Sequence, residues 1–133
     1  MFRLAFVGCL ALSVIGCGSA TDARFPGDAA LFEIEVSGEV FTVAVATASQ
    51  AADLRARMQS GTRGVVMGSL AAGNGGFNAP WPWHMTLQSV ETADVAIELC
   101  DGRPSMVSAD LAYWIGTVRQ FCPWGAKVVR EKT

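Results

Sequence analysis

The chain has 133 residues, of which 51% are hydrophobic and 17% are charged, and its formal net charge is −2 at neutral pH. Acidic residues outnumber basic ones and no cluster of lysine or arginine occurs, which argues against a nucleic-acid partner. A single histidine argues against a Ser-His-Asp triad and against a zinc site, so we expect no catalytic residue, metal or cofactor.

Residues 1–16 are predicted to be a secretory leader. Arg3 precedes an apolar run that is too short to span a bilayer, since a spanning helix needs about 20 residues. The run ends in VIGC, which resembles the bacterial lipoprotein signal. The resemblance implies that Cys17 is acylated and that the protein is exported and anchored to the membrane of the bacterial cell envelope. The alternative is a plain signal peptide cut near Ala20, which would give a secreted protein.

The segment from residue 17 to residue 30 follows the leader and is small, polar and without periodicity. It is predicted to be a flexible tether between the lipidated cysteine and the folded part. Residues 31–133 have the length of one ordinary domain.

That domain is expected to open with a β-hairpin. Residues 31–36 alternate apolar side chains with glutamates, and residues 39–46 continue as a second strand. Ser37 and Gly38 between them suit a two-residue turn.

A helix is predicted next, over residues 47–61. Thr47 and Gln50 have the spacing of a capping box, in which each side chain bonds the other's backbone. Gly61 is placed to end the helix.

A strand is predicted at residues 64–70, followed by a glycine-rich loop at 71–78 and two strands at 83–88 and 93–100. A long helix at 103–118 and a last strand at 124–131 complete the domain. The order is strand, strand, helix, strand, strand, strand, helix, strand. It predicts an α+β domain with a mostly antiparallel sheet of five or six strands and two helices packed on one face.

Two cysteines, Cys100 and Cys122, lie in the predicted domain. In an exported protein such a pair indicates one disulfide. A thiolate site, catalytic or metal-binding, is the competing interpretation, but no CxxC motif supports it and only one histidine is available as a partner.

Three motifs follow one another in the domain: PWPWHM at 80–85, AIELCDGRP at 96–104 and FCPW at 121–124. They resemble a family of small exported domains, the N-terminal domain family named after binding protein seventy-four. The resemblance covers about residues 31–132 and implies a fold and an exported location, but no catalytic mechanism. The matching positions are Trp81, Trp83, His84, Met85, Ile97, Glu98, Cys100, Asp101, Cys122, Pro123 and Trp124.

The motifs also supply a candidate binding site. Trp81 and Trp124 are predicted to be aromatic platforms. His84, Glu98 and Asp101 are predicted polar contacts, with His84 facing Glu98 across neighbouring strands. The structural alternative is that Trp83 fills the core, His84 hydrogen-bonds a neighbour such as Glu98, and Asp101 caps the following helix.

A non-enzymatic binding domain that recognises a protein or glycan is therefore the function we expect, held at the membrane by its lipid. One alternative is a small hydrolase that uses His84 with Glu98 or Asp101. Another is a protease-inhibitor-like module that acts through the loop at residues 71–78.

Overall fold

The computed structural model describes residues 29–133 of the chain. The predicted leader, Cys17 and nearly all of the tether lie outside the described residues. The elements in chain order are β1 (Ala30–Val36), β2 (Glu39–Val45), α1 (Ala48–Ser60), β3 (Val65–Ala72), β4 (Trp83–Met85), η1 (Leu87–Ser89), β5 (Glu91–Ala93), η2 (Glu98–Cys100), α2 (Pro104–Ala109), α3 (Leu111–Tyr113), the π-helical turn η3 (Trp114–Val118), β6 (Gln120–Phe121) and β7 (Lys127–Lys132).

The predicted hairpin is confirmed. β1 and β2 pair antiparallel, with Val36 opposite Glu39. Ser37 and Gly38 form the turn, with φ angles of 53° and 81°. Two positive φ angles in succession are the signature of the tight turn whose twist matches that of the flanking strands.

The strands form two antiparallel sheets. One has the order β2-β1-β7, and the other is built around the long strand β3. β4 pairs with the end of β3, β5 pairs with its start, and β6 pairs with its middle. A bridge between Gly64 and Ala126 links the second sheet to the residues that lead into β7.

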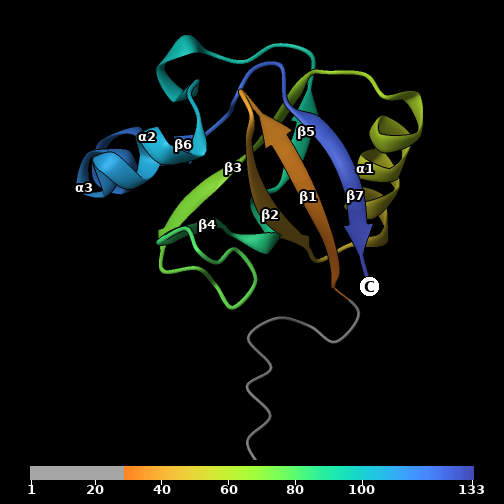
Figure 1. Ribbon diagram of the computed structural model, residues 1–133, viewed down its shortest axis with the longest axis horizontal. Helices are drawn as coiled ribbons and strands as arrows, with labels where there is room; N and C mark the ends of the chain where they lie inside the picture. Colours follow the sequence, from red (N-terminus) through yellow and green to blue (C-terminus); the bar gives the residue numbers. More distant parts are fainter. Residues whose placement is uncertain (1–28) are drawn as a thin grey trace, which may run out of the picture.

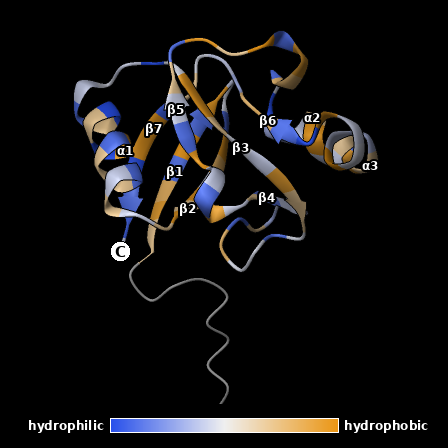
Figure 2. Cartoon of the chain, turned by 180° about the vertical axis from the view of Figure 1, so that it is seen from behind, coloured by the Kyte–Doolittle hydropathy of each residue, from blue (hydrophilic) through white to orange (hydrophobic). Residues whose placement is uncertain are grey.

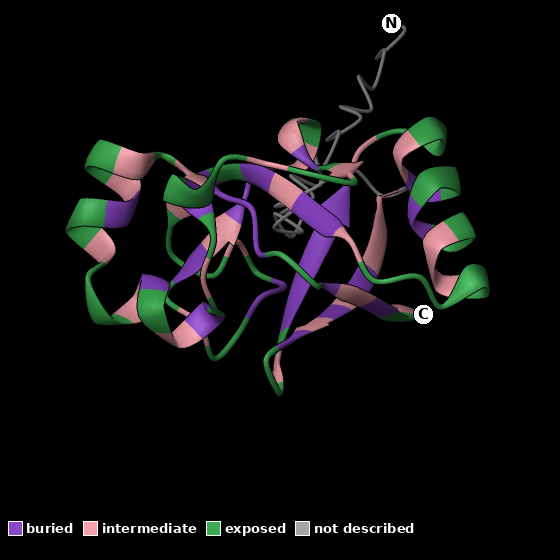
Figure 3. Cartoon of the chain, turned by 90° about the horizontal axis from the view of Figure 1, so that it is seen from above, coloured by how far each residue is buried: buried purple, intermediate pink, exposed green. Residues whose placement is uncertain are grey.

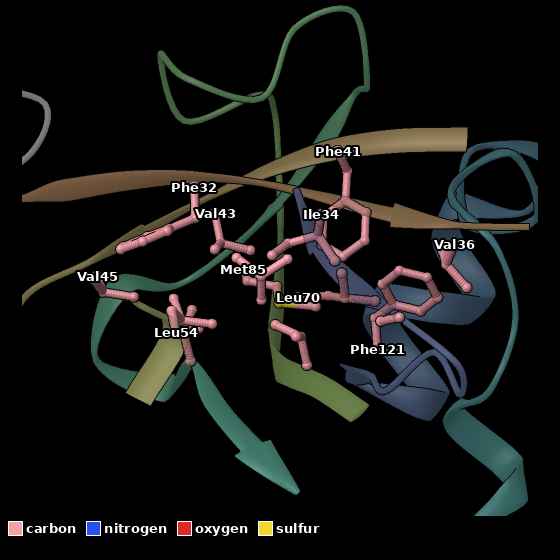
Figure 4. Close-up of a cluster of buried hydrophobic side chains, with 14 of the residues drawn as sticks. Phe32, Ile34, Val36, Phe41, Val43, Val45, Leu54, Leu70, Met85 and Phe121 are labelled. Atoms are coloured by element: carbon pink, nitrogen blue, oxygen red, sulfur yellow. The ribbon is translucent and has the colours of Figure 1, made fainter. Parts of the chain in front are cut away.

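Between the sheets lies the hydrophobic core, because both present alternating apolar residues inward. Figure 4 shows side chains of β1 and β2 meeting those of α1, β3, β4 and β6. The residues labelled there are Phe32, Ile34, Val36, Phe41, Val43, Val45, Leu54, Leu70, Met85 and Phe121.

The predicted helix α1 is confirmed with both of its caps. Thr47 and Gln50 form the reciprocal capping box, and Gly61 ends the helix in the left-handed conformation. The Gln50 amide also donates to the carbonyl oxygens of Leu87 and Val90, each at 2.9 Å. One side chain thus closes the helix start and fixes the segment between β4 and β5.

The α+β class is confirmed, but the layers differ from the expected single sheet with both helices on one face. Helix α1 packs beside β7 and β5, whereas α2 and α3 lie at the opposite side of the strands (Figure 1, Figure 3). The helices separate because the strands divide between two sheets.

The predicted strand over residues 93–100 is wrong. Pairing ends with β5 at Ala93, and a 3-10 turn from Glu98 to Cys100 follows an irregular segment. Val95, Ile97 and Leu99 alternate as they would in a strand, but they point to solvent and are 74%, 65% and 59% exposed. The alternation gives the period of the side chains and does not say whether anything covers them.

The predicted helix over residues 103–118 is broken into α2, α3 and η3. Asp110 interrupts it with φ −139° and ψ 62°, and its carboxylate accepts the backbone N–H of Tyr113. Aspartate competes in this way because its short side chain bonds nearby backbone groups. Val107 and Trp114, on either side of the break, are both buried in the core.

Two further strands are shorter than predicted. Regular pairing of residues 83–88 stops after Met85, where the 3-10 turn η1 begins. The last strand begins at Lys127 rather than at residue 124, because Gly125 takes a left-handed conformation with φ 69°.

Candidate functional site

The segment between β3 and β4 closes the outer edge of β2. Asn78 is 1% exposed, and its side-chain oxygen accepts the backbone N–H of Thr42 at 2.7 Å. Its amide donates to the carbonyl oxygen of Trp83 at 2.8 Å. One buried amide therefore stands in for a missing neighbour strand, which satisfies backbone groups that burial would otherwise penalise.

The two tryptophans of this segment are parts of the core and its rim. Trp83 is fully buried and lies edge-on to Phe121, with ring centroids 5.3 Å apart. Trp81 stacks on Trp83, and its indole N–H donates to the carbonyl oxygen of Val40 at 2.8 Å. The structure thus gives Trp81, predicted as a binding platform, a structural hydrogen bond to the β2 edge.

His84 is held in one orientation by the glycine-rich loop. Its Nδ1 lies 2.7 Å from the carbonyl oxygen of Gly73, and Phe77 lies edge-on to its ring. A carbonyl oxygen only accepts, so Nδ1 carries the proton in this hydrogen bond. The ring borders a hollow of about 390 Å³ lined by Gly73, Asn74, Gly75, Gly76, Phe77, His84 and Leu87.

The predicted contact between His84 and Glu98 is wrong. His84 pairs with Ala71 near the end of β3, whereas Cys100, two residues after Glu98 in the chain, packs against Val65 at the start of β3. These two positions lie about 20 Å apart along an extended strand. The 3-10 turn η1, the strand β5 and the irregular segment after β5 separate two residues that the sequence places on adjacent strands.

The predicted disulfide is present. Cys100 and Cys122 are joined, with Cα atoms 5.1 Å apart, and both are buried. The backbone N–H of Cys122 also donates to the carbonyl oxygen of Cys100 at 2.8 Å. The bridge fixes the end of the exposed segment 94–99 to the segment between β6 and β7.

Asp101 and Trp124, two of the predicted site residues, do meet. One carboxylate oxygen of Asp101 accepts the backbone N–H groups of Trp124 and Gly102, each at 2.8 Å. The Trp124 side chain is 42% exposed beside them. We call this region the Trp124 cleft: it has a volume of about 300 Å³ and is lined by Ser37, Asp101, Gly102, Arg103, Met106 and Trp124.

Arg103 and Met106 were not predicted as site residues, and they add a cation and a flexible apolar side chain to the cleft.

Behind them, Glu39 accepts the backbone N–H and the hydroxyl of Ser105, at 2.8 and 2.6 Å, and lies 4.0 Å from Arg103. The Ser105 hydroxyl is the main reason that the pKa of the Glu39 carboxyl lies below its usual value, with desolvation acting in the opposite direction. The start of β2 and the start of α2 are thereby tied together. The sequence signal that could have located these residues is their proximity to the Asp-Gly pair that precedes the helix.

The five predicted site residues therefore divide among three places. Trp81 lies in the segment that closes β2 and His84 follows on β4, Asp101 and Trp124 line the cleft, and Glu98 is exposed on its 3-10 turn. Within residues 29–133, no group of three or more histidine, cysteine or acidic side chains could hold a metal ion. No helix in this range is long and apolar enough to cross a membrane.

Comparison with models of protein families gives a match over the folded part. The model of the N-terminal domain family named after binding protein seventy-four matches residues 28–133, which is most of the chain and the whole of the folded part described above. A search of curated proteins and a search of solved structures found no match. The chain therefore belongs to this family of N-terminal domains.

Proposed function

We propose that this protein is a non-enzymatic binding domain that recognises a protein or glycan partner at the Trp124 cleft, and that a lipid on Cys17 anchors it to the bacterial cell envelope. The observation that supports this role is an exposed tryptophan at the edge of a cleft that also holds the Arg103 guanidinium and the Asp101 carboxylate. An aromatic face flanked by charged groups suits a sugar ring or an apolar peptide side chain.

The position of the cleft agrees with an anchored, outward-facing domain. Ser37, which lines the cleft, lies at the end of β1, and Ala30 lies at its start. In Figure 1 β1 begins at the lower end of the molecule and the hairpin turn lies at the upper end. A tether that reaches β1 from the membrane would therefore leave the cleft on the far side.

Neither alternative function gains comparable support. A hydrolase that pairs His84 with Glu98 or Asp101 needs them within hydrogen-bond reach, and they lie at opposite ends of β3. An inhibitory loop must be free to enter a protease, but Phe77 and Asn78 in the glycine-rich loop are buried.

The test is a binding screen with the purified full-length chain against immobilised bacterial glycans and a peptide array. We expect Trp124→Ala to weaken a specific interaction about tenfold or more without lowering the melting temperature. Tyr113→Ala is the matched control, because Tyr113 is 43% exposed on α3 and is not among the residues that line the cleft, so its loss should leave binding unchanged. Equal binding by the wild type and Trp124→Ala would contradict the proposal.

A further inference from the structure

A second exposed feature, the apolar ridge, crosses the same end of the molecule. It consists of Val95, Ile97 and Leu99, which have the highest exposed fractions among the large exposed hydrophobic side chains of the described chain. Figure 2 shows the segment between β5 and α2 as a largely hydrophobic stretch on the outside of the molecule. Isolated exposed apolar residues are ordinary, but three on one short segment mark a contact surface.

The ridge is held in place at both ends. On one side, Ala93 pairs with Val65, and the Asp94 carboxylate accepts from Arg57 at 3.0 Å. On the other side, Cys100 is bridged to Cys122. The ridge side chains therefore stay exposed because the backbone that carries them is fixed.

The underside of the segment is already occupied. Ala96 packs against the small buried cluster of Val65, Cys100 and Cys122. The carbonyl oxygen of Ile97 lies 3.4 Å from each of the two bridged sulfur atoms. The backbone cannot rotate its outer side chains into the protein without displacing these contacts, so no other part of the described residues 29–133 covers them.

The charge around the ridge indicates which molecule. Residues 94–101 contain three acidic residues and no lysine or arginine. Arg57 pairs with Asp94, and Arg103 lines the cleft beside Asp101, so Glu98 is the carboxylate that the described residues leave without an ion pair. The Glu98 side chain is exposed between two ridge residues. The Glu98 carboxylate, set between two apolar side chains, disfavours an anionic lipid surface and also disfavours a second copy of the ridge, because like charges repel at an interface.

We infer that the apolar ridge docks into an apolar groove of a partner protein, and that lysine or arginine side chains of the partner border this groove. The inference rests on the proposed binding role but not on the Trp124 cleft as its site. Apolar contact provides the affinity, and the acidic side chains select the basic border.

The test uses two amphipathic peptides of equal length, one with leucine and lysine and the other with leucine and glutamate, titrated into the full-length chain. We expect the lysine peptide to bind, and the glutamate peptide to bind about tenfold more weakly or not at all. The double variant Ile97→Ser/Leu99→Ser should lose the lysine peptide. Glu98→Gln should bind it more weakly and with a smaller dependence on salt concentration.

Val129→Ser is the matched control, because Val129 is an apolar residue on β7 that is 46% exposed. Equal affinity for both peptides, or binding that survives the double variant, would overturn the inference. So would ridge-dependent binding to vesicles of phosphatidylethanolamine and phosphatidylglycerol, or ridge-dependent self-association in the ultracentrifuge. Trp124→Ala should keep the lysine peptide, so a failure of the cleft proposal is distinguishable from a failure of the ridge inference.

Discussion

Asn78 is the residue on which the closed edge of β2 depends most directly. Its amide bonds one backbone group of β2 and one of β4, and both bonds are buried. A side chain that satisfies two backbone groups away from water is worth more than an exposed hydrogen bond, because its removal leaves both groups desolvated and unpaired.

We therefore expect Asn78→Ala to lower the free energy of unfolding by about 3 kcal/mol, from two unsatisfied buried groups. Urea denaturation is the measurement. Asn74→Ala is the matched control, because its side-chain oxygen accepts only the exposed backbone N–H of Gly76. Equal losses for the two variants would show that burial of the Asn78 bonds is not what matters.

Gly75 has no side chain, and this leaves room for the rings of His84 and Phe77. A Cβ atom there would lie 2.9 Å from the His84 ring and 2.8 Å from the Phe77 ring, and the backbone has φ +66°. Gly73 has a similar φ of +78°, but a Cβ atom there would meet nothing within 4 Å. The two positions thus separate backbone strain from steric contact.

Gly73→Ala should cost roughly 1–2 kcal/mol for the left-handed backbone alone. Gly75→Ala should cost at least about 1 kcal/mol more, because the rings must also move. Thermal unfolding of both variants measures the difference, and equal melting temperatures would refute the predicted contact with His84.

Several charge pairs join elements that are far apart in sequence. Glu33 on β1 accepts two hydrogen bonds from Arg130 on β7, and Glu131 pairs with Arg55 on α1. The Arg130 hydrogen bonds are the main reason that the pKa of Glu33 lies below its ordinary value of 4.5, and Arg55 lowers the pKa of Glu131 in the same way.

A lowered carboxyl pKa gives stability a defined pH dependence. The contribution of Glu33 should be fully present above pH 4.5, the ordinary value, and lost as the pH falls through the lowered value in the folded state. Denaturation at a series of acidic pH values should show this loss. Glu33→Gln should flatten the curve in that range, and an unchanged curve would contradict the assignment.

The disulfide ties the exposed segment 94–99 to the segment between β6 and β7, across a sequence separation of 22 residues. On the chain-entropy account such a loop contributes about 3.4 kcal/mol. Cys122→Ser should lower the melting temperature accordingly, while thiol titration of the unfolded, unreduced wild type should detect neither cysteine of the pair. Two reactive thiols there would end the prediction.

For the molecule as a whole, the anchor remains a prediction from the VIGC sequence. We expect mass spectrometry of the membrane fraction to find a mature protein that begins at an acylated Cys17. Cys17→Ser should move the protein to the soluble fraction without changing the fold. A soluble wild-type product that starts beyond Cys17 would refute the anchor and leave the two proposed binding surfaces untouched.

The sequence alone determined the features that depend on neighbouring residues. Ser37-Gly38 specifies its turn, Thr47 and Gln50 specify the helix start, and the two cysteines of the predicted domain specify their bridge. The turn and the helix cap depend on residues within a few positions of each other, and each cysteine of the domain has only one other cysteine there to pair with. The α+β class followed for the same reason, since it requires only the order of the elements.

Only the tertiary structure decided which surfaces are free. Residues 95, 97 and 99 would show the same alternation in a buried strand and in an exposed ridge. Alternation determines that their side chains point the same way, but not whether another part of the protein packs on them. His84 and Glu98 have matching parities, yet they lie at opposite ends of β3, because η1 and the irregular segment after β5 intervene. A sequence motif does not contain the residues that it will contact from other parts of the chain. Only the structure therefore shows that Asn78 and Trp81 hydrogen-bond to β2, and that Trp124 lies at an exposed cleft.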